Sequence, residues 1–163
     1  MIEIEKNGKT YKVKSELNEI NLQEFERIGD IYNSDDNNVT KYIKIVTELG
    51  LPYEISDQLG YKSLIKIVKE LNLKGGELKS EFKLGDREFK LDDLEELSAG
   101  KLSKIESIYV EEKDMKSARI ISVLTNTEDV EFLYNNLTVD IAGPILTKID
   151  LDLLENLNVN YDS

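Results

Sequence analysis

The sequence contains neither cysteine nor histidine in its 163 residues. Without cysteine the chain forms no disulfides, has no thiolate chemistry and lacks the usual cysteine-ligated zinc sites. Without histidine it lacks the most common general base near neutral pH and the most common metal ligand. A catalytic site would have to be built from carboxylates, lysine, tyrosine or hydroxyl groups. We therefore expect a protein that is not an enzyme, with no catalytic residues, no cofactor and no metal site.

Long apolar runs and basic charge are also scarce. No apolar run approaches the roughly 20 residues that a membrane span needs, and the alternating N-terminal residues MIEIEKNGKTYKV do not resemble a signal peptide. Lysine and arginine number 21 against 33 acidic residues, which gives a net charge of −12. This charge repels phosphate backbones and anionic lipids. We expect no direct nucleic-acid binding and no membrane association, and a basic or neutral protein partner fits better.

The main positive feature is an apolar pattern that occurs twice, about 78 residues apart. Residues 2–13 match residues 80–91, and residues 27–32 match residues 104–109. Further matches pair Ile43, Ile45, Val46, Thr47, Leu59, Ile67 and Val68 with Ile121, Val123, Leu124, Thr125, Leu137, Ile145 and Leu146. Such a repeat predicts two similar modules, at residues 1–78 and 79–163. The alternative is two unrelated small α+β halves that share only amphipathic periodicity.

Each module is predicted to begin with a β-hairpin. Residues 2–6 and 9–13 alternate in polarity around Asn7-Gly8, the strongest short hairpin signal, because a type I′ turn needs positive φ at both central residues. The second hairpin is expected at residues 81–83 and 87–91, around a less ideal turn of Leu84-Gly85-Asp86.

Helical patterns follow each hairpin. Asn21 and Glu24 form the signature of a capped helix start, and one apolar face then contains Leu22, Phe25, Ile28, Ile31 and Tyr32. In the second module Leu102, Ile105, Ile108 and Tyr109 repeat this face, and residues 98–100 either interrupt or begin the helix. Tyr32 and Tyr109 are expected to pack the same corner of each module.

Two more helical segments follow in each module. The next pair is expected at residues 39–49 and 116–125, with Gly50 as a natural stop for the first. After a short connector, residues 61–71 and 139–149 form a last amphipathic helix. Pro144 is tolerated if that helix begins near Asp140 and predicts a kink if it begins earlier. The fold class is thus α+β, with two tandem modules, each a hairpin followed by three to four short helices.

Three patterns invite a chemical interpretation, and each has a simpler one. Gly8-Lys9-Thr10 resembles the end of a phosphate loop, but Glu3 stands where that motif needs glycine, and a turn explains the tripeptide. Acidic clusters at residues 35–36, 92–96 and 150–155 lack the glycine and the spacing of a calcium loop, and solvated helix starts explain those at 92–93. Mimicry of nucleic acid needs long carboxylate rows, whereas basic residues are interspersed here.

The segments NGKTYKV (7–13), LNEINLQEFERI (17–28) and REFKLDDLEELSAGKLSKI (87–105) resemble small tailed-bacteriophage proteins. Tail assembly chaperones and accessory virion proteins are similar in their short polar hairpin, which leads into a helix with the same spacing. The resemblance implies a non-enzymatic role in assembly, located in the virion or the host cytoplasm. Its partners would be phage structural proteins or further copies in a homo-oligomeric ring. The tandem duplication departs from the single unit usual in the chaperones.

A second hypothesis is an acidic inhibitor or regulatory module that binds a basic protein partner. A third, an enzyme that uses carboxylates, has the least support from the sequence.

Overall fold

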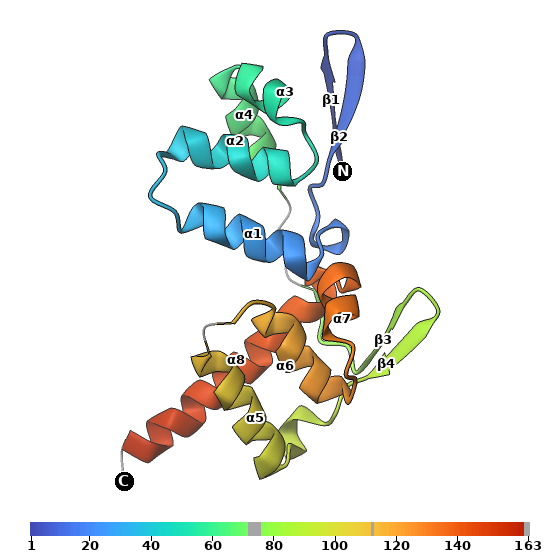
Figure 1. The fold of residues 1–163 in the computed structure, drawn as a ribbon, viewed down its shortest axis with the longest axis vertical. Coiled ribbons are helices and arrows are strands. Elements are labelled where there is room, and N and C mark those ends of the chain that lie inside the picture. The colour runs from blue at the N-terminus through green and yellow to red at the C-terminus, as the bar shows by residue number, and fades with distance from the viewer. Residues whose placement is uncertain (72–75, 112, 162–163) are drawn as a thin grey trace. The chain divides into compact units, whose positions relative to one another are not determined.

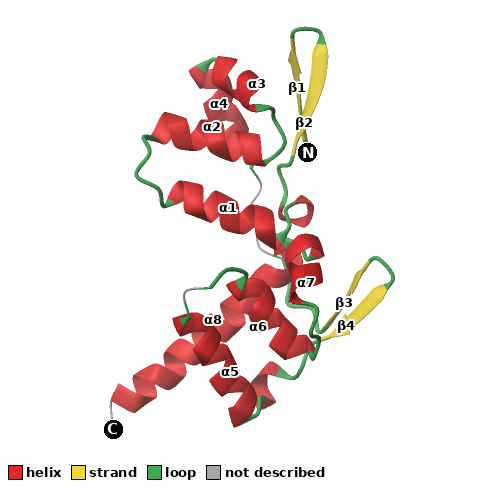
Figure 2. Cartoon of the chain, in the orientation of Figure 1, coloured by secondary structure: helices red, strands yellow, loops and turns green. Residues whose placement is uncertain are grey.

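The computed structural model describes residues 1–71, 76–111 and 113–161, with side chains as far as residue 151. Helices and two antiparallel hairpins make this an α+β protein (Figure 2). The chain divides into two compact units, Met1–Lys74 and Gly75–Ser163, called unit 1 and unit 2 below. The junction expected near residue 78 lies a few residues into unit 2.

The two units contain the same elements in the same order (Figure 1). Unit 1 has β1 (Ile2–Lys6), β2 (Lys9–Val13), the 3-10 turn η1 (Leu17–Glu19), α1 (Leu22–Tyr32), α2 (Asn38–Glu48), α3 (Tyr53–Gln58) and α4 (Tyr61–Lys69). Unit 2 has β3 (Glu81–Leu84), β4 (Arg87–Lys90), η2 (Leu94–Glu96), α5 (Ala99–Val110), α6 (Lys116–Thr125), α7 (Val130–Asn136) and α8 (Val139–Tyr161). Each element of unit 2 begins 77 to 79 residues after its counterpart, for example at Ala99 against Leu22.

The hairpins differ in their turns. Asn7 and Gly8 have φ of 54° and 74°, which confirms the predicted turn with positive φ at both central residues. In the second hairpin Leu84 pairs with Arg87, so Leu84 belongs to the strand and its assignment to the turn was wrong. The turn then contains two residues, and Gly85 supplies the positive φ of 61° at its first position.

Polar side chains begin the equivalent helices α1 and α5. The Asn21 side chain accepts from the Glu24 backbone N–H at 2.8 Å, and the Glu24 carboxylate accepts from the Asn21 N–H at 3.1 Å, which confirms the predicted capping signature. The Ser98 hydroxyl oxygen accepts from the Lys101 N–H at 3.2 Å. Ser98 therefore caps α5, and residues 98–100 begin this helix rather than interrupt it.

Each unit has its own apolar core under the helices. The most deeply buried side chains of unit 1 are Val13, Ile20, Val46, Leu49, Leu51 and Leu64, and those of unit 2 include Ile105, Ile121, Leu124, Leu133, Leu137 and Ile145. The expected apolar face of α1 is buried only at Leu22. Tyr32 is 71% exposed, so the expectation that it packs into its unit is wrong.

The second helix of each unit ends in the same hydrogen-bonded motif. In unit 1 the Gly50 N–H donates to Thr47 at 3.1 Å and the Leu51 N–H donates to Val46 at 3.2 Å, as in a Schellman ending. Gly50 has a φ of 121°, and a Cβ there would lie 2.9 Å from the Lys12 carbonyl oxygen. In unit 2 Asn126, with a φ of 53°, takes the left-handed position.

Pro144 lies in the second turn of α8, since this helix begins at Val139. Proline has no N–H, so the Asp140 carbonyl loses its usual partner four residues later. The backbone of Gly76 approaches this carbonyl so closely that a Cβ there would lie 2.8 Å from its oxygen. Helix α8 continues through residues 151–157 and ends at Tyr161.

Two glycines of unit 1 form a matched pair for substitution. Gly50→Ala should lower the free energy of unfolding by about 2 kcal/mol, because a left-handed residue with a Cβ is strained and here also meets a carbonyl oxygen. Gly29→Ala, inside α1 with open space around its Cβ position, should raise the free energy by roughly 0.5–1 kcal/mol. Urea unfolding followed by circular dichroism measures both. Equal effects of the same sign would contradict this account.

Candidate functional site

One backbone hydrogen bond fastens each hairpin to the helical part of its unit. In unit 1 the Lys14 N–H, just after β2, donates to the Leu49 carbonyl at 2.9 Å. In unit 2 the Asp92 N–H donates to the Leu124 carbonyl, also at 2.9 Å. Both acceptors lie at the C-terminal end of the second helix, where backbone carbonyls have no partner within the helix. The chain leaving each hairpin is thus held by the end of α2 or α6.

Next to this hydrogen bond lies an ion pair whose charges are reversed between the units. The Lys14 ammonium pairs with the Glu24 carboxylate in unit 1. In unit 2 the equivalent positions hold Asp92 and Lys101, which pair in the opposite sense. Glu24 and Lys101 are both the third residue of their helices. Both units therefore have an ion pair between the hairpin exit and the start of the next helix. The positive group lies on the hairpin side in unit 1 and on the helix side in unit 2.

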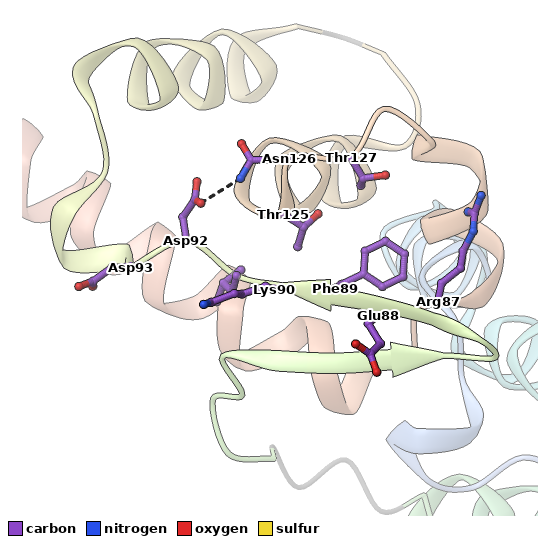
Figure 3. Close-up of a pocket in the computed structure, with 10 residues that line it drawn as sticks. Arg87, Glu88, Phe89, Lys90, Asp92, Asp93, Thr125, Asn126 and Thr127 are labelled. Atoms are coloured by element: carbon purple, nitrogen blue, oxygen red, sulfur yellow. Dashed lines mark hydrogen bonds between the residues drawn. The ribbon is translucent and has the colours of Figure 1, made fainter.

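Asn126 completes the cluster in unit 2. Its side-chain N–H donates to the Asp92 carboxylate at 3.0 Å, drawn as the dashed line in Figure 3, and its side-chain oxygen accepts from the Lys101 ammonium at 2.6 Å. An amide offers both a donor and an acceptor, so it satisfies both partners of the ion pair.

A cleft of about 680 Å³ opens beside this cluster, between β4 and the end of α6 (Figure 3). It is lined by Arg87, Glu88, Phe89, Lys90, Leu91, Asp92, Asp93, Thr125, Asn126 and Thr127. Its three carboxylates are already engaged: Asp92 with Lys101, Glu88 with Lys83 at 3.0 Å, and Asp93 with the Glu95 N–H at 3.0 Å. The Thr125 hydroxyl donates to the Ile121 carbonyl at 2.8 Å. These contacts support the fold.

The rim of the cleft is an aromatic stack that anchors the second hairpin to α7. Ring centroids lie 5.3 Å apart for Phe82 and Phe89 and 6.2 Å apart for Phe89 and Phe132. The Arg87 guanidinium lies 4.1 Å from the centroid of Phe132 and pairs with Asp129 at 2.9 Å. The Asp129 carboxylate accepts hydrogen bonds from Arg87 and from the Phe132 backbone N–H. These two bonds hold the pKa of the Asp129 carboxyl below its usual range. Unit 1 has Ile4 and Tyr11 in the places of Phe82 and Phe89.

The net charge of the chain is concentrated in unit 2. Residues 1–74 contain 11 basic and 13 acidic side chains, whereas residues 75–163 contain 10 basic and 20 acidic ones. The two units therefore present similar folds with different electrostatic surfaces.

The structure also places the patterns that the sequence had singled out. Gly8 lies in the turn and Lys9 and Thr10 begin β2, so no helix follows to bind a phosphate. Asp36 pairs with Lys44, which holds the pKa of this carboxyl below its usual range. Within the described residues, no three acidic side chains gather in a way that could hold a metal ion. Asp152 and Glu155 lie outside the described side chains.

Sequence reasoning missed the reversed ion pair. The signal was present in the sequence, because two pairs of matched positions have opposite charges in the two copies: Lys14 with Asp92, and Glu24 with Lys101. Residues that agree between the two copies predict the repeat, and positions with opposite charges do not contribute to that agreement.

Comparison of the chain with protein-family models, with curated proteins and with solved structures found no match. Among the described helices, none has both the length and the apolar character needed to cross a membrane.

The reversed pair predicts the outcome of a charge exchange. Asp92→Lys should destabilise unit 2 by about 1 kcal/mol, since two ammonium groups then face each other. Adding Lys101→Glu should recover this loss, because it recreates the polarity of unit 1 and places an acid at a helix start. A double-mutant cycle in urea measures the coupling. The same exchange at the exposed Lys83 and Glu88 is the control and should change stability little. A double variant no more stable than Asp92→Lys would contradict the structural role.

Asp129 predicts a pH dependence. The pKa of the Asp129 carboxyl is lower in the folded chain than in the unfolded chain. The ionised carboxylate therefore stabilises the fold above the ordinary carboxyl range, about pH 4. This stabilisation is lost as the pH falls through the pKa of the folded state. Asp129→Asn should therefore be less stable than the parent near pH 6 and approach it near pH 3. Urea unfolding across this range measures the difference. Glu131→Gln, an exposed change on the same helix, controls for net charge and should show no such convergence.

Proposed function

We propose that this chain is a non-enzymatic structural or assembly protein of a tailed bacteriophage that acts through contacts with other proteins. The observation that carries the proposal is the repetition of one unit within one chain. Two similar folds on one polypeptide suit a protein that contacts repeated or adjacent partners. The resemblance of residues 7–28 and 87–105 to small phage proteins supplies the biological setting.

The hairpins offer one means of contact. Each is a two-stranded sheet, and no third strand pairs with it in the described ranges. The outer edges of such a sheet present backbone N–H and C=O groups that a partner strand can pair with. On the outward face of the hairpin in unit 1, Glu3 lies opposite Lys12 and Glu5 lies opposite Thr10. This pattern limits unspecific pairing and favours a partner with matching charges.

Assembly with other virion proteins tests this function. The purified chain should form complexes of defined stoichiometry with neighbouring phage structural gene products, measured by mass photometry, and should be found by mass spectrometry in particles or assembly intermediates. A matched sample of the same proteins without the chain is the control. A stable monomer that joins none of these proteins would contradict the proposal.

The concentration of charge in unit 2 favours a second candidate, an acidic regulatory module that binds a basic protein. Unit 2 alone has twice as many acidic as basic side chains. Binding of this kind depends strongly on salt, because the Debye length shrinks from about 10 Å at 0.1 M to about 3 Å at 1 M. Affinity for a basic target that does not fall with salt would count against this alternative.

A further inference from the structure

The first helix of unit 1 exposes its apolar face more than its counterpart in unit 2 does. Phe25 and Tyr32 on α1 are 47% and 71% exposed, and Ile28 and Ile31 between them are half-buried. These four residues form the α1 stripe. On α5 the matched positions hold Leu102, Ile105, Ile108 and Tyr109, with Ile105 at 0% and Ile108 at 7% exposure. Leu102 and Tyr109 are half-buried, so each of the four positions is more buried on α5 than on α1.

The two units also differ in the length of the last helix. Helix α4 ends at Lys69, whereas α8 continues from Val139 to Tyr161, well past the matching point near residue 147. In that continuation Ile149 is buried, at 1% exposure, and the Tyr109 hydroxyl donates to the Asp150 carboxylate. This continuation therefore gives Tyr109 of α5 a polar partner. Unit 1 has no element of this kind among its described residues.

We propose that the α1 stripe is a docking site for an acidic amphipathic helix of a partner protein, seated where the continuation of α8 lies in unit 2. The proposal rests on the function proposed above and names the kind of partner that unit 1 takes. Such helix-in-groove binding buries apolar anchors spaced three and four residues apart.

Charge complementarity favours an acidic helix in this place. The Lys41 ammonium lies 5.9 Å from the centroid of the Tyr32 ring and donates to the Tyr32 carbonyl at 2.9 Å. This ammonium places a positive charge beside the α1 stripe, where it would attract the carboxylates of an acidic helix. Unit 1 is also close to neutral, with 11 basic and 13 acidic side chains, so it does not repel an acidic helix as unit 2 would.

A peptide of this chain provides a probe of the required chemistry. The fluorescein-labelled peptide TKIDLDLLENLNVNY, residues 147–161, contains Ile149 and Asp150 in an acidic context. Its binding to the full-length chain should be seen by fluorescence anisotropy. Phe25→Ser and Tyr32→Ser in the full-length chain should each weaken binding about tenfold or more, as expected for aromatic anchors. Both side chains are exposed, so these variants should fold as the parent does, which circular dichroism checks.

Three further variants sharpen the test. Tyr61→Ser removes an equally exposed tyrosine from α4, at 59% exposure, and should leave affinity unchanged. Tyr32→Phe keeps the ring and removes the hydroxyl, so it should weaken binding less than Tyr32→Ser. Asp150→Asn in the peptide should weaken binding to the parent, but should have a smaller effect on binding to Tyr32→Phe.

The outcomes separate this inference from the function on which it rests. Absence of peptide binding, or binding that Phe25→Ser and Tyr32→Ser do not weaken, would overturn the inference. Light scattering that shows self-association of the chain, lost in both variants, would also overturn it, because a second copy would then be the occupant. If both variants still assemble with phage structural proteins as the parent does, the proposed function stands and the docking site falls.

Discussion

The hydrogen bond between the hairpin exit and the end of the second helix is the contact on which each unit depends. A two-stranded hairpin buries too little apolar surface to be stable alone, so it must be held by the helices that follow it. In each unit one backbone hydrogen bond holds the hairpin to the helices. The Lys14 N–H donates to the Leu49 carbonyl in unit 1, and the Asp92 N–H donates to the Leu124 carbonyl in unit 2. These two carbonyls can accept the hydrogen bond because the second helix ends in a left-handed residue, Gly50 or Asn126. This residue turns the chain away and leaves the carbonyls accessible. The ion pair beside it then fixes the start of the first helix against the hairpin exit.

Local signals predicted much of this architecture, and the features they missed depend on contacts between distant residues. Asn7-Gly8, the Asn21 and Glu24 cap and the Gly50 stop all act within a few residues, and the structure has each of them. Whether an apolar face is buried depends instead on what packs against it. Tyr32 lies on the apolar face of α1 and is nevertheless 71% exposed, which no pattern within α1 reveals. Likewise, the cluster around Asp92 joins residues from β4, α5 and α6, and only a position-by-position comparison of charge between the copies would have predicted it.

Comparison of the two units separates what folding requires from what it leaves free. The hydrogen bond from the hairpin exit to the second helix, the cap of the first helix and the left-handed end of the second helix each occur in both units. Each of them satisfies backbone groups that would otherwise be unpaired. The sign of the ion pair, the aromatic stack and the net charge differ, because packing tolerates several solutions for them. Unit 2 anchors its hairpin with Phe82, Phe89 and Phe132, whereas unit 1 has smaller apolar contacts and a more exposed hairpin. One unit is thus more fully packed and strongly acidic, and the other is close to neutral with more apolar surface exposed.

The matched tyrosines show why that asymmetry matters. Tyr109 has an intramolecular partner in Asp150, and the neighbouring Ile149 of α8 is buried. Tyr32 occupies the same place on α1, yet α4 ends before it can supply either group. An exposed apolar side chain contributes little to the stability of its own unit, so the core of unit 1 does not require a tyrosine there. The Lys41 ammonium lies beside the Tyr32 ring, and the side chain is 71% exposed, so the partner helix proposed above could supply the group that Asp150 supplies to Tyr109.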